Sequence, residues 1–364
     1  MKQRLEHISK LQVPTWSWLA INDTNAELDF TGLKPYGKDS LQNTNSNIRI
    51  EKENGTEGIR TEGKASGATA EIREFVEKHK NQSCHMSIEA GQIVEEPVLV
   101  DFTMDKENAL LIDQIIIDAG EDSRATVILN YSSGKEEHGI HCGYAQLNLK
   151  KGAEVNLIKV QLLSENHIHV DATEVHVDEA ARGNILLAEL GSREAVSACN
   201  VALCKESSRT DIDNIYVGNK SKVIDMNYRV EYDGTNTEGY ITSRGVLLGS
   251  SRKVLKNTLD FLAGASGSKG REEESAIALS ETAVNISAPL LLCGEDSVEG
   301  QHASNIGKPE DNKLFYLMSR GLSEKEAKKL MVEASFAPII NKIPQETLRN
   351  QISRYLTEVI QNGE

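Results

Sequence analysis

The sequence predicts a mainly β fold in which the strands form a solenoid and helices occur only near the two ends of the chain. Between about residues 86 and 292, short runs rich in β-branched residues alternate with turns rich in Gly, Asp and Lys. Glycines at these turns lie 32, 31 and 35 residues apart, at Gly120, Gly152, Gly183 and Gly218. A period of this length without helices favours a coil of parallel β-helix. A β-sandwich, whose hairpins also give irregular spacing, remains the alternative.

Residues 1–85, which precede the strands, are interpreted as an arm that contains one short helix. An apolar stretch at residues 16–21 is followed by a polar region up to residue 65, which indicates a loosely packed segment. At residues 71–80 the positions of Ile72, Phe75 and Val76 have helical spacing and predict an amphipathic helix. We expect this helix to cap the strand body, which spans residues 86–305.

Helical patterns return in residues 306–364, which are predicted to form a C-terminal helical domain. A first helix over residues 310–320 ends at Gly321, a residue typical of helix C-termini. Ser323 and Glu326 have the spacing of a capping box and begin a second helix, which Pro338 should end, and a third helix follows Pro344. We expect removal of this domain to leave the strand body folded. The apolar stripes predicted for the second and third helices are Ala327, Leu330, Met331 and Ala334, and Leu348, Ile352, Tyr355 and Val359.

Composition narrows the class of protein and its partners. The 364 residues carry a formal net charge of −15, with a pI of about 5.2, which argues against nucleic acid or an anionic membrane as a partner. No apolar run is long enough to span a membrane, and the first residues lack the apolar core of a signal peptide. The five cysteines are scattered and odd in number, as expected for reduced thiols. These features predict a cytoplasmic protein.

Cys293 and His302 are the residues whose types and spacing best fit metal or sulfur chemistry. Cys293 ends an apolar run and precedes His302 by nine residues, with an acidic, glycine-containing turn between them. Thiolate and imidazole groups are ligands that iron and iron–sulfur clusters select. The alternative is structural, with Cys293 in the core at a strand end and His302 hydrogen-bonded in a turn.

The remaining motifs give weaker signals for a site. His167 and His169 occupy alternate positions of a strand and share one face, but a third ligand is missing, and a solvent-facing polar side is the simpler interpretation. The sequence has no P-loop, no dinucleotide-binding glycine pattern, no nucleophile elbow and no HExxH motif. The glycine-rich stretch 264–270 precedes Arg271 and three glutamates, which would repel an anion, so it is predicted to be a flexible loop.

The residues that follow His302 resemble a known family. Gly307 lies five residues after His302, and the run Leu-Phe-Tyr-Leu-Met-Ser-Arg-Gly begins at Leu314. This combination is similar to the C-terminal signature of the SufB/SufD family, the scaffold subunits that assemble iron–sulfur clusters. The resemblance is densest over residues 240–364. It implies a right-handed parallel β-helix body with a C-terminal α-helical domain.

The resemblance also implies a function, partners and site residues. A family member is a non-catalytic scaffold subunit of the SUF complex that pairs with a SufB-type subunit or a second copy of itself. Its helical tail resembles the docking site for the SufC ATPase, which supplies ATP hydrolysis. Cys293 and His302 would bind iron or a cluster transiently, with no cofactor held tightly by the isolated chain. Glu324 lies near a glutamate of SufB-type members and is a third candidate ligand, although the helix dipole also explains an acidic residue in a first turn.

The resemblance favours a SufD-like over a SufB-like role. SufB members tend to carry a sulfur-accepting cysteine after a strand that corresponds to residues 125–131, where this chain has Ser132 and Ser133. One alternative is a stand-alone homodimeric SufB-like scaffold, which the presence of Cys293 supports. The alternative from another class is a β-helix carbohydrate-active enzyme, which would need several carboxylates clustered on one face of the solenoid. The strand runs show no such cluster.

Overall fold

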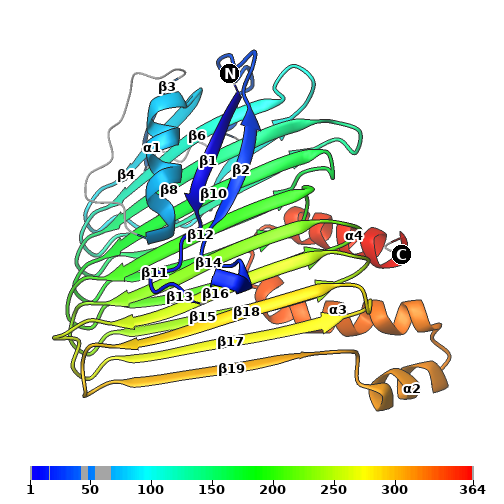
Figure 1. The fold of residues 1–364 in the computed structure, drawn as a ribbon. Coiled ribbons are helices and arrows are strands. Elements are labelled where there is room, and N and C mark those ends of the chain that lie inside the picture. The colour runs from blue at the N-terminus through cyan, green and yellow to red at the C-terminus, as the bar shows by residue number, and fades with distance from the viewer. Residues whose placement is uncertain (1, 16, 42–47, 54–66, 363–364) are drawn as a thin grey trace.

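The fold is a parallel β-helix built from two sheets that face each other (Figure 1). The computed structural model describes residues 2–15, 17–41, 48–53 and 67–362. From residue 82 onward the chain alternates between the sheets, and every neighbouring pair of strands in this region is parallel. The predicted parallel β-helix is thereby confirmed, and the antiparallel sandwich is excluded.

The first sheet has nine strands in the described part of the chain, with β18 at one edge and β3 at the other. Its strands are β3 (Arg49–Glu53), β4 (Gln82–Ile88), β6 (Leu110–Ala119), β8 (Gly139–Leu149), β10 (His167–Val177), β12 (Glu194–Leu203), β14 (Val223–Tyr232), β16 (Arg252–Phe261) and β18 (Val284–Cys293). Only β3 runs antiparallel to its neighbour.

The second sheet has eight described strands, and β19 forms its edge at the same end of the solenoid as β18. Its strands are β5 (Val98–Met104), β7 (Arg124–Ser133), β9 (Glu154–Leu162), β11 (Arg182–Glu189), β13 (Arg209–Gly218), β15 (Glu238–Leu247), β17 (Lys269–Ala278) and β19 (Glu299–Gly307). The boundaries expected at residues 86 and 305 therefore fall inside β4 and β19.

The repeat of the solenoid is set by a backbone conformation rather than by glycine. Seven successive turns from the first sheet to the second each contain a residue with φ between 53° and 77°, and only three of these seven residues are glycines. The last turn also contains Gly264, with a φ of 105°. Gly183 lies inside β11 and Gly218 ends β13, so the glycine spacing read from the sequence marks the length of a coil but not an equivalent position. The seven residues are Gly91, Asp122, Gly152, Ala180, Ser207, Asn236 and Gly267.

Residues with a common register form columns inside the solenoid. Parallel strands place register partners on the same side of a sheet, so each coil adds one residue to each column. Most columns are apolar and make up the large core cluster between the sheets. One such column contains Val98, Val127, Leu157, Ile185, Ile212 and Ile241.

The C-terminal helices cover the outer face of the second sheet. They are α2 (Asp311–Ser319), α3 (Glu324–Ile340) and α4 (Glu346–Asn362). Val332, Phe336 and Ile339 of α3 are buried against outward-facing apolar residues of the strands, and α4 adds Leu348 and Ile352 to the same cluster. The helical region is therefore continuous with the body through a shared hydrophobic core.

Two details of the predicted second helix are wrong. Leu330 of the predicted stripe is exposed, because the sheet contacts the face that carries Phe336 instead. Pro338 lies inside α3 rather than after it. Proline has no backbone N–H, so one helical hydrogen bond is missing in this last turn of α3. The capping box of Ser323 and Glu326 and the stripe of α4 are confirmed.

The described parts of the N-terminal region pack closely against the first sheet, which corrects the expectation of a loose arm there. Residues 42–47 and 54–66 of the expected polar region lie outside the described residues. The hairpin of β1 (Lys2–Ile8) and β2 (Thr24–Asp29) and the helix α1 (Ala70–His79) share a core with the outer face of β6, β8, β10 and β12. Ile72, Phe75 and Val76 are buried as predicted. The helix covers this sheet face rather than capping the end of the solenoid. Two 3-10 turns, η1 (Ser17–Leu19) and η2 (Gly67–Thr69), complete the region.

Two buried hydrogen bonds attach Ser9 of the N-terminal segment to β14 and β16, close to the β18 edge of the first sheet. The Ser9 hydroxyl donates to Asp225 at 2.5 Å, and the Lys256 ammonium donates to the Ser9 carbonyl at 2.7 Å. Lys256 also lies 2.7 Å from Asp225.

Among the described residues, no helix is long and apolar enough to cross a membrane.

Candidate functional site

Cys293 is the last residue of β18, at the open end of the first sheet. Its register partner on β16 is Phe261, a buried residue whose ring stacks on Tyr232 with a centroid distance of 4.1 Å. Because register partners face the same side, the Cys293 side chain faces the interior of the solenoid. No described strand lies beyond β18, so the thiol is exposed and is not a core residue.

His302 lies in β19, at the open end of the second sheet. Its register partner on β17 is Glu272, and the same column continues through Ile241 and Ile212 in the hydrophobic core. The His302 side chain therefore also faces the interior. It is exposed and makes no hydrogen bond or ion pair with another described residue, and it belongs to a strand rather than to a turn.

The two candidate residues thus face the space between the sheets at the same end of the solenoid, one from each sheet. The Cys293 thiol and the His302 imidazole are groups that could ligate iron, whereas an iron–sulfur cluster normally takes about four protein ligands. No group of three or more His, Cys, Asp or Glu side chains within the described ranges is placed to hold a metal ion. These two residues would therefore supply at most part of the coordination sphere of a cluster.

Glu324 is placed separately, in the first turn of α3. Its carboxylate forms an ion pair with Lys328 at 2.6 Å, and this hydrogen-bonded contact lowers the pKa of the Glu324 carboxyl. No hydrogen bond or ion pair joins Glu324 to Cys293 or His302 in the part of the chain that the structure describes. The local contact with Lys328 and the helix N-terminus account for this glutamate.

Polar residues missed by the sequence analysis occupy the interior next to the open end. The stretch after the glycine-rich loop is the strand β17, and its alternation places Glu272 and Glu274 inside. The Lys253 ammonium contacts the Glu274 carboxylate, and the Tyr216 hydroxyl donates to the same oxygen at 2.9 Å. Burial raises the pKa of the Glu272 carboxyl, and a hydrogen bond from Asn257 at 2.8 Å opposes that rise. The period-two pattern of residues 269–278 was the signal available in the sequence.

A second buried network corrects the solvent-facing interpretation of His167 and His169, both of which are buried inside the solenoid. The Nδ1 atoms of His141 and His169 lie 2.7 Å apart, and Nε2 of His141 lies 2.6 Å from Asp113. The Lys159 ammonium donates to Asp171 at 2.5 Å in the same layer. Desolvation lowers the pKa of His169 well below its usual value.

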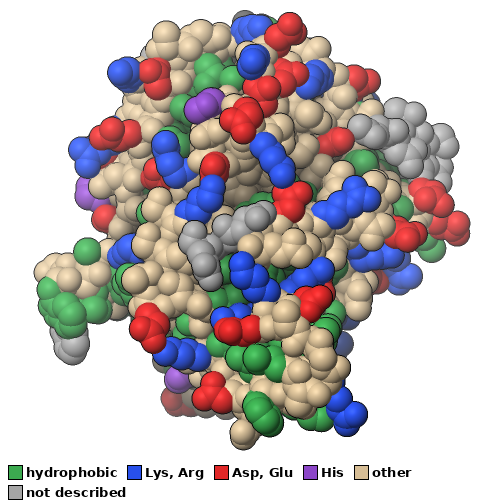
Figure 2. All heavy atoms as spheres, turned by 90° about the vertical axis from the view of Figure 1, so that its right-hand side faces the viewer, with side chains coloured by type: hydrophobic (Ala, Val, Ile, Leu, Met, Phe, Trp, Pro, Cys, Tyr) green, Lys and Arg blue, Asp and Glu red, His purple; other side chains and the backbone are tan. Residues whose placement is uncertain are grey.

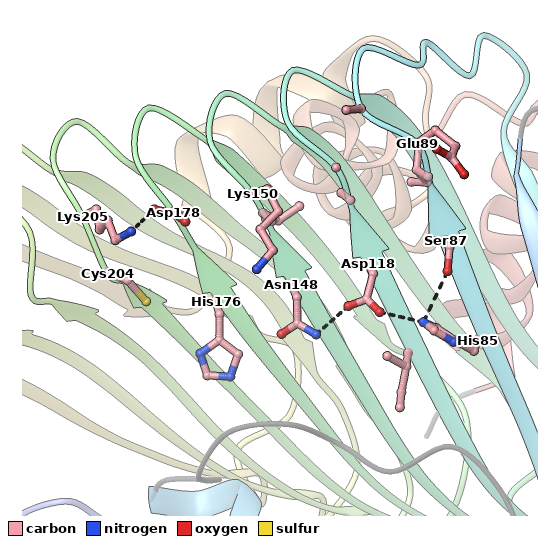
Figure 3. A pocket seen from close by; sticks show the side chains of 16 residues that line it. His85, Ser87, Glu89, Asp118, Asn148, Lys150, His176, Asp178, Cys204 and Lys205 are labelled. Carbon is pink, nitrogen blue, oxygen red and sulfur yellow. Dashed lines mark hydrogen bonds and ion pairs between the residues drawn. The ribbon is translucent and has the colours of Figure 1, made fainter.

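A further hollow, of about 780 Å³, lies at the carboxyl ends of β4, β6, β8, β10 and β12 (Figure 3). Figure 3 shows His85, Asp118 and Asn148 in a row along its wall. Nε2 of His85 is 2.6 Å from Asp118, and the Ser87 hydroxyl is 3.5 Å from the same nitrogen. A catalytic triad binds the serine and the acid through different ring nitrogens. Ser87, His85 and Asp118 therefore do not form a nucleophilic triad.

Comparison with known families gives a match over most of the strand body and into α3. Residues 102–335 match the model of the SUF system FeS cluster assembly SufBD core domain. The matched region contains Cys293, His302 and Glu324. It ends before α4 begins.

Curated relatives agree with the family match. The chain is 26% identical to the iron–sulfur cluster assembly protein SufD of Bacillus subtilis over 292 residues, which cover 76% of this chain and 66% of the relative. It is 28% identical to a SufBD family protein of Pyrococcus horikoshii, over 57% of this chain and 46% of the relative. A SufBD family protein of Staphylococcus epidermidis is 22% identical, over 70% of this chain and 55% of the relative. The chain spans about half to two thirds of the length of these relatives.

Proposed function

Because this chain belongs to the SufBD family of the SUF iron–sulfur cluster assembly system, we propose that it is a non-catalytic scaffold subunit of that complex, acting in the cytoplasm. In this proposal it pairs through its open end with a second SufB/SufD-type subunit and binds a SufC-type ATPase through its C-terminal helices. The observation that carries the proposal is the placement of Cys293 and His302 on the two edge strands of one end. The family match covers most of the strand body and argues against the carbohydrate-active alternative.

The open end has the properties of a pairing surface. Both β18 and β19 have one edge without a partner strand among the described residues, and unpaired edges are templates for strand addition by another chain. Val284, Leu291 and Ile306 are exposed on the same two strands. A partner that pairs with these edges would bring its own ligands to Cys293 and His302, and two ligands from each subunit would satisfy one cluster.

Replacing His302 with alanine should leave the fold intact and lower the cluster yield of the reconstituted complex several-fold. The side chain is exposed and makes no hydrogen bond or ion pair with another described residue, so its loss removes a ligand without a packing defect. The measurement is iron and acid-labile sulfide content after anaerobic reconstitution with SufC- and SufB-type partners. His138→Ala, at an exposed histidine in a turn, is the matched control.

The companion variant Cys293→Ser separates two roles. A similar loss of yield is expected if the subunit is SufB-like, and a nearly unchanged yield if it is SufD-like. Full yield from the His302→Ala complex would contradict the proposed site. The mass of the purified chain in solution then distinguishes a homodimer from a subunit that awaits a SufB-type partner.

The proposed ATPase-binding surface is the apolar side of α2 and α3. The side chains of Phe315, Tyr316 and Leu330 are 74%, 56% and 44% exposed, and α2 has no buried residue in the structure. A cavity of about 400 Å³ separates the two helices and is lined by Leu317 and Met331 among others. Figure 2 shows the side of the molecule that lies on the right in Figure 1. Hydrophobic side chains gather in the lower part of this view, where Figure 1 places α2 and α3. Exposed apolar helical surfaces of this kind bind partner proteins.

Phe315→Asp is expected to abolish co-purification with the SufC-type ATPase while leaving the melting temperature unchanged. The substitution places a charge in an apolar contact, but the residue is exposed in the isolated chain, so folding is not affected. Val13→Asp, at an exposed apolar residue of the N-terminal region, is the control and should retain the ATPase. Unchanged binding of the ATPase by Phe315→Asp would place the interface elsewhere.

A further inference from the structure

A polar cavity lies between the two sheets in the last coils of the solenoid. Its volume is about 310 Å³, and it is lined by residues of β16, β17, β18 and β19. Glu272 in its wall is the register partner of His302, so the cavity adjoins the end that carries the candidate site. The polar residues of its lining are Asn257, Glu272, Glu274, Asn285, Ser287 and Ser304.

Three buried oxygen atoms in this lining have no hydrogen-bond partner among the described residues. They are Oε2 of Glu272, Oδ1 of Asn257 and Oδ1 of Asn285. All three accept hydrogen bonds and cannot donate them. Leaving one such acceptor unsatisfied costs about 1–3 kcal/mol, and native structures commonly account for such groups with a bound water or ion.

The charges around the cavity favour a cation. Glu272 is only 4% exposed, and its second oxygen accepts from the Asn257 amide, which is neutral. Glu274 is compensated by Lys253, which is fully buried and also donates to Ser287 at 2.9 Å. Lys253 offsets one of the two carboxylates, whereas Glu272 has no ion pair with another described residue. Burial raises the pKa of the Glu272 carboxyl, and the nearby His302 and Lys253 only partly oppose that rise. A buried charge without an opposite charge is strongly unfavourable, so a cation in the cavity would stabilise this arrangement.

We propose that this cavity binds a divalent metal ion through the carboxylate of Glu272 and the amide oxygens of Asn257 and Asn285, with water completing the coordination. Oxygen donors of this kind suit hard or borderline ions such as Mg²⁺, Mn²⁺ and Fe²⁺. With one carboxylate and two neutral donors the affinity is low, with a Kd above about 10⁻⁵ M. A weakly bound ion is available for transfer. That the physiological ion is ferrous iron, held beside His302 before it enters a cluster, rests on the proposed function.

The test uses the isolated full-length chain and the metal alone. Mn²⁺ binding is measured by electron paramagnetic resonance, and anaerobic Fe²⁺ binding by calorimetry. Glu272→Gln keeps the shape of the side chain and removes its charge, and it should weaken both metals by at least about 10-fold. Glu273→Gln is the matched control, because this neighbour points to the outer face and pairs with Arg244 at 2.5 Å. It should bind as the unmodified chain does.

A gain-of-affinity variant keeps the test decisive if Glu272→Gln does not fold. Asn257→Asp adds a second carboxylate to the donor set and should raise the Mn²⁺ affinity by about 10-fold. The proposal is overturned if the unmodified chain shows no saturable Mn²⁺ or Fe²⁺ binding, which would leave water as the occupant. It is also overturned if Glu272→Gln binds normally or if Asn257→Asp binds no more tightly.

This outcome is separable from that of the proposed function. His302→Ala should retain the Mn²⁺ affinity of the isolated chain, since the histidine does not line the cavity. Normal metal binding together with full cluster yield from the His302→Ala complex would refute the cluster site and leave the cavity site standing. Loss of cluster yield without any metal binding in the cavity would do the reverse.

Discussion

A chain that ends at Gly307 is expected to be aggregated or unfolded, in contrast to the independence of the tail that the sequence predicts. The second sheet presents apolar residues outward, and α3 and α4 cover them. Each buried Leu, Ile or Val contributes about 1.5–3 kcal/mol, so exposing half of these residues would cost about as much as the 5–15 kcal/mol that holds a typical domain together. The outward-facing residues are Ile128, Ile158, Val160, Leu186, Ala188, Leu190, Ile215, Val217, Val246 and Leu248.

The truncated chain would be examined by light scattering, circular dichroism and thermal unfolding. Its control replaces residues 311–319 with a flexible linker and keeps α3 and α4. That variant should remain monodisperse and melt normally, because α2 buries no residue of its own. A truncated chain that is soluble, rich in strand and cooperative in melting would show that the body folds without its helices.

Acid is expected to destabilise this protein between about pH 6.5 and pH 4 through His167. Burial, followed by the nearby His138 and His141, lowers the pKa of His167 to about 4. In the unfolded chain the same imidazole takes up a proton near pH 6.5. Within this window the unfolded state binds more protons than the folded state, so stability falls as the pH falls. The slope for one histidine is about 1.4 kcal/mol per pH unit, which amounts to roughly 3 kcal/mol at pH 4.

The measurement is urea unfolding at several pH values for the unmodified chain and for His167→Gln. The two free energies of unfolding should converge as the pH decreases, because glutamine does not titrate. This difference isolates the histidine from the buried carboxyls of Asp171 and Glu189, whose raised pKa values act in the opposite direction. His302→Gln, at an exposed histidine of β19, should keep the slope of the unmodified chain. Parallel curves for His167→Gln and the unmodified chain would contradict the prediction.

The buried polar residues of β10 and β17 show why the alternating pattern of a strand does not predict which polar residues lie inside the solenoid. Period-two alternation places Glu272 and Glu274 on one face of a strand, and His167 and His169 on one face of another. It does not say whether that face meets solvent or the opposite sheet. Inside the solenoid, the partner of Glu274 is Lys253 on the other sheet, and the partner of Asp171 is Lys159. Such pairs exist only after the coils close.

The helices likewise combine features that follow from the local sequence with features that depend on packing against the sheet. The capping box at Ser323 and the apolar positions of α1 and α4 follow from local rules, and the structure confirms them. The buried face of α3 does not, since Leu330 and Phe336 are both apolar and lie on different sides of the helix. The outward apolar surface of the second sheet selected Phe336. Leu330 was left in the exposed surface that we propose as a docking site.

The sequence by itself predicted the strand-rich region between about residues 86 and 292, the length of a coil and the three terminal helices, and it singled out Cys293 and His302 as the candidate pair. Each of these depends on residues close together in the chain or on a motif of fixed spacing. Only the tertiary structure decided which strand faces are interior, that both candidate residues lie at one open end, and that Glu272 lies beside His302. These features depend on the register between coils, which brings together residues about 30 positions apart through backbone hydrogen bonds.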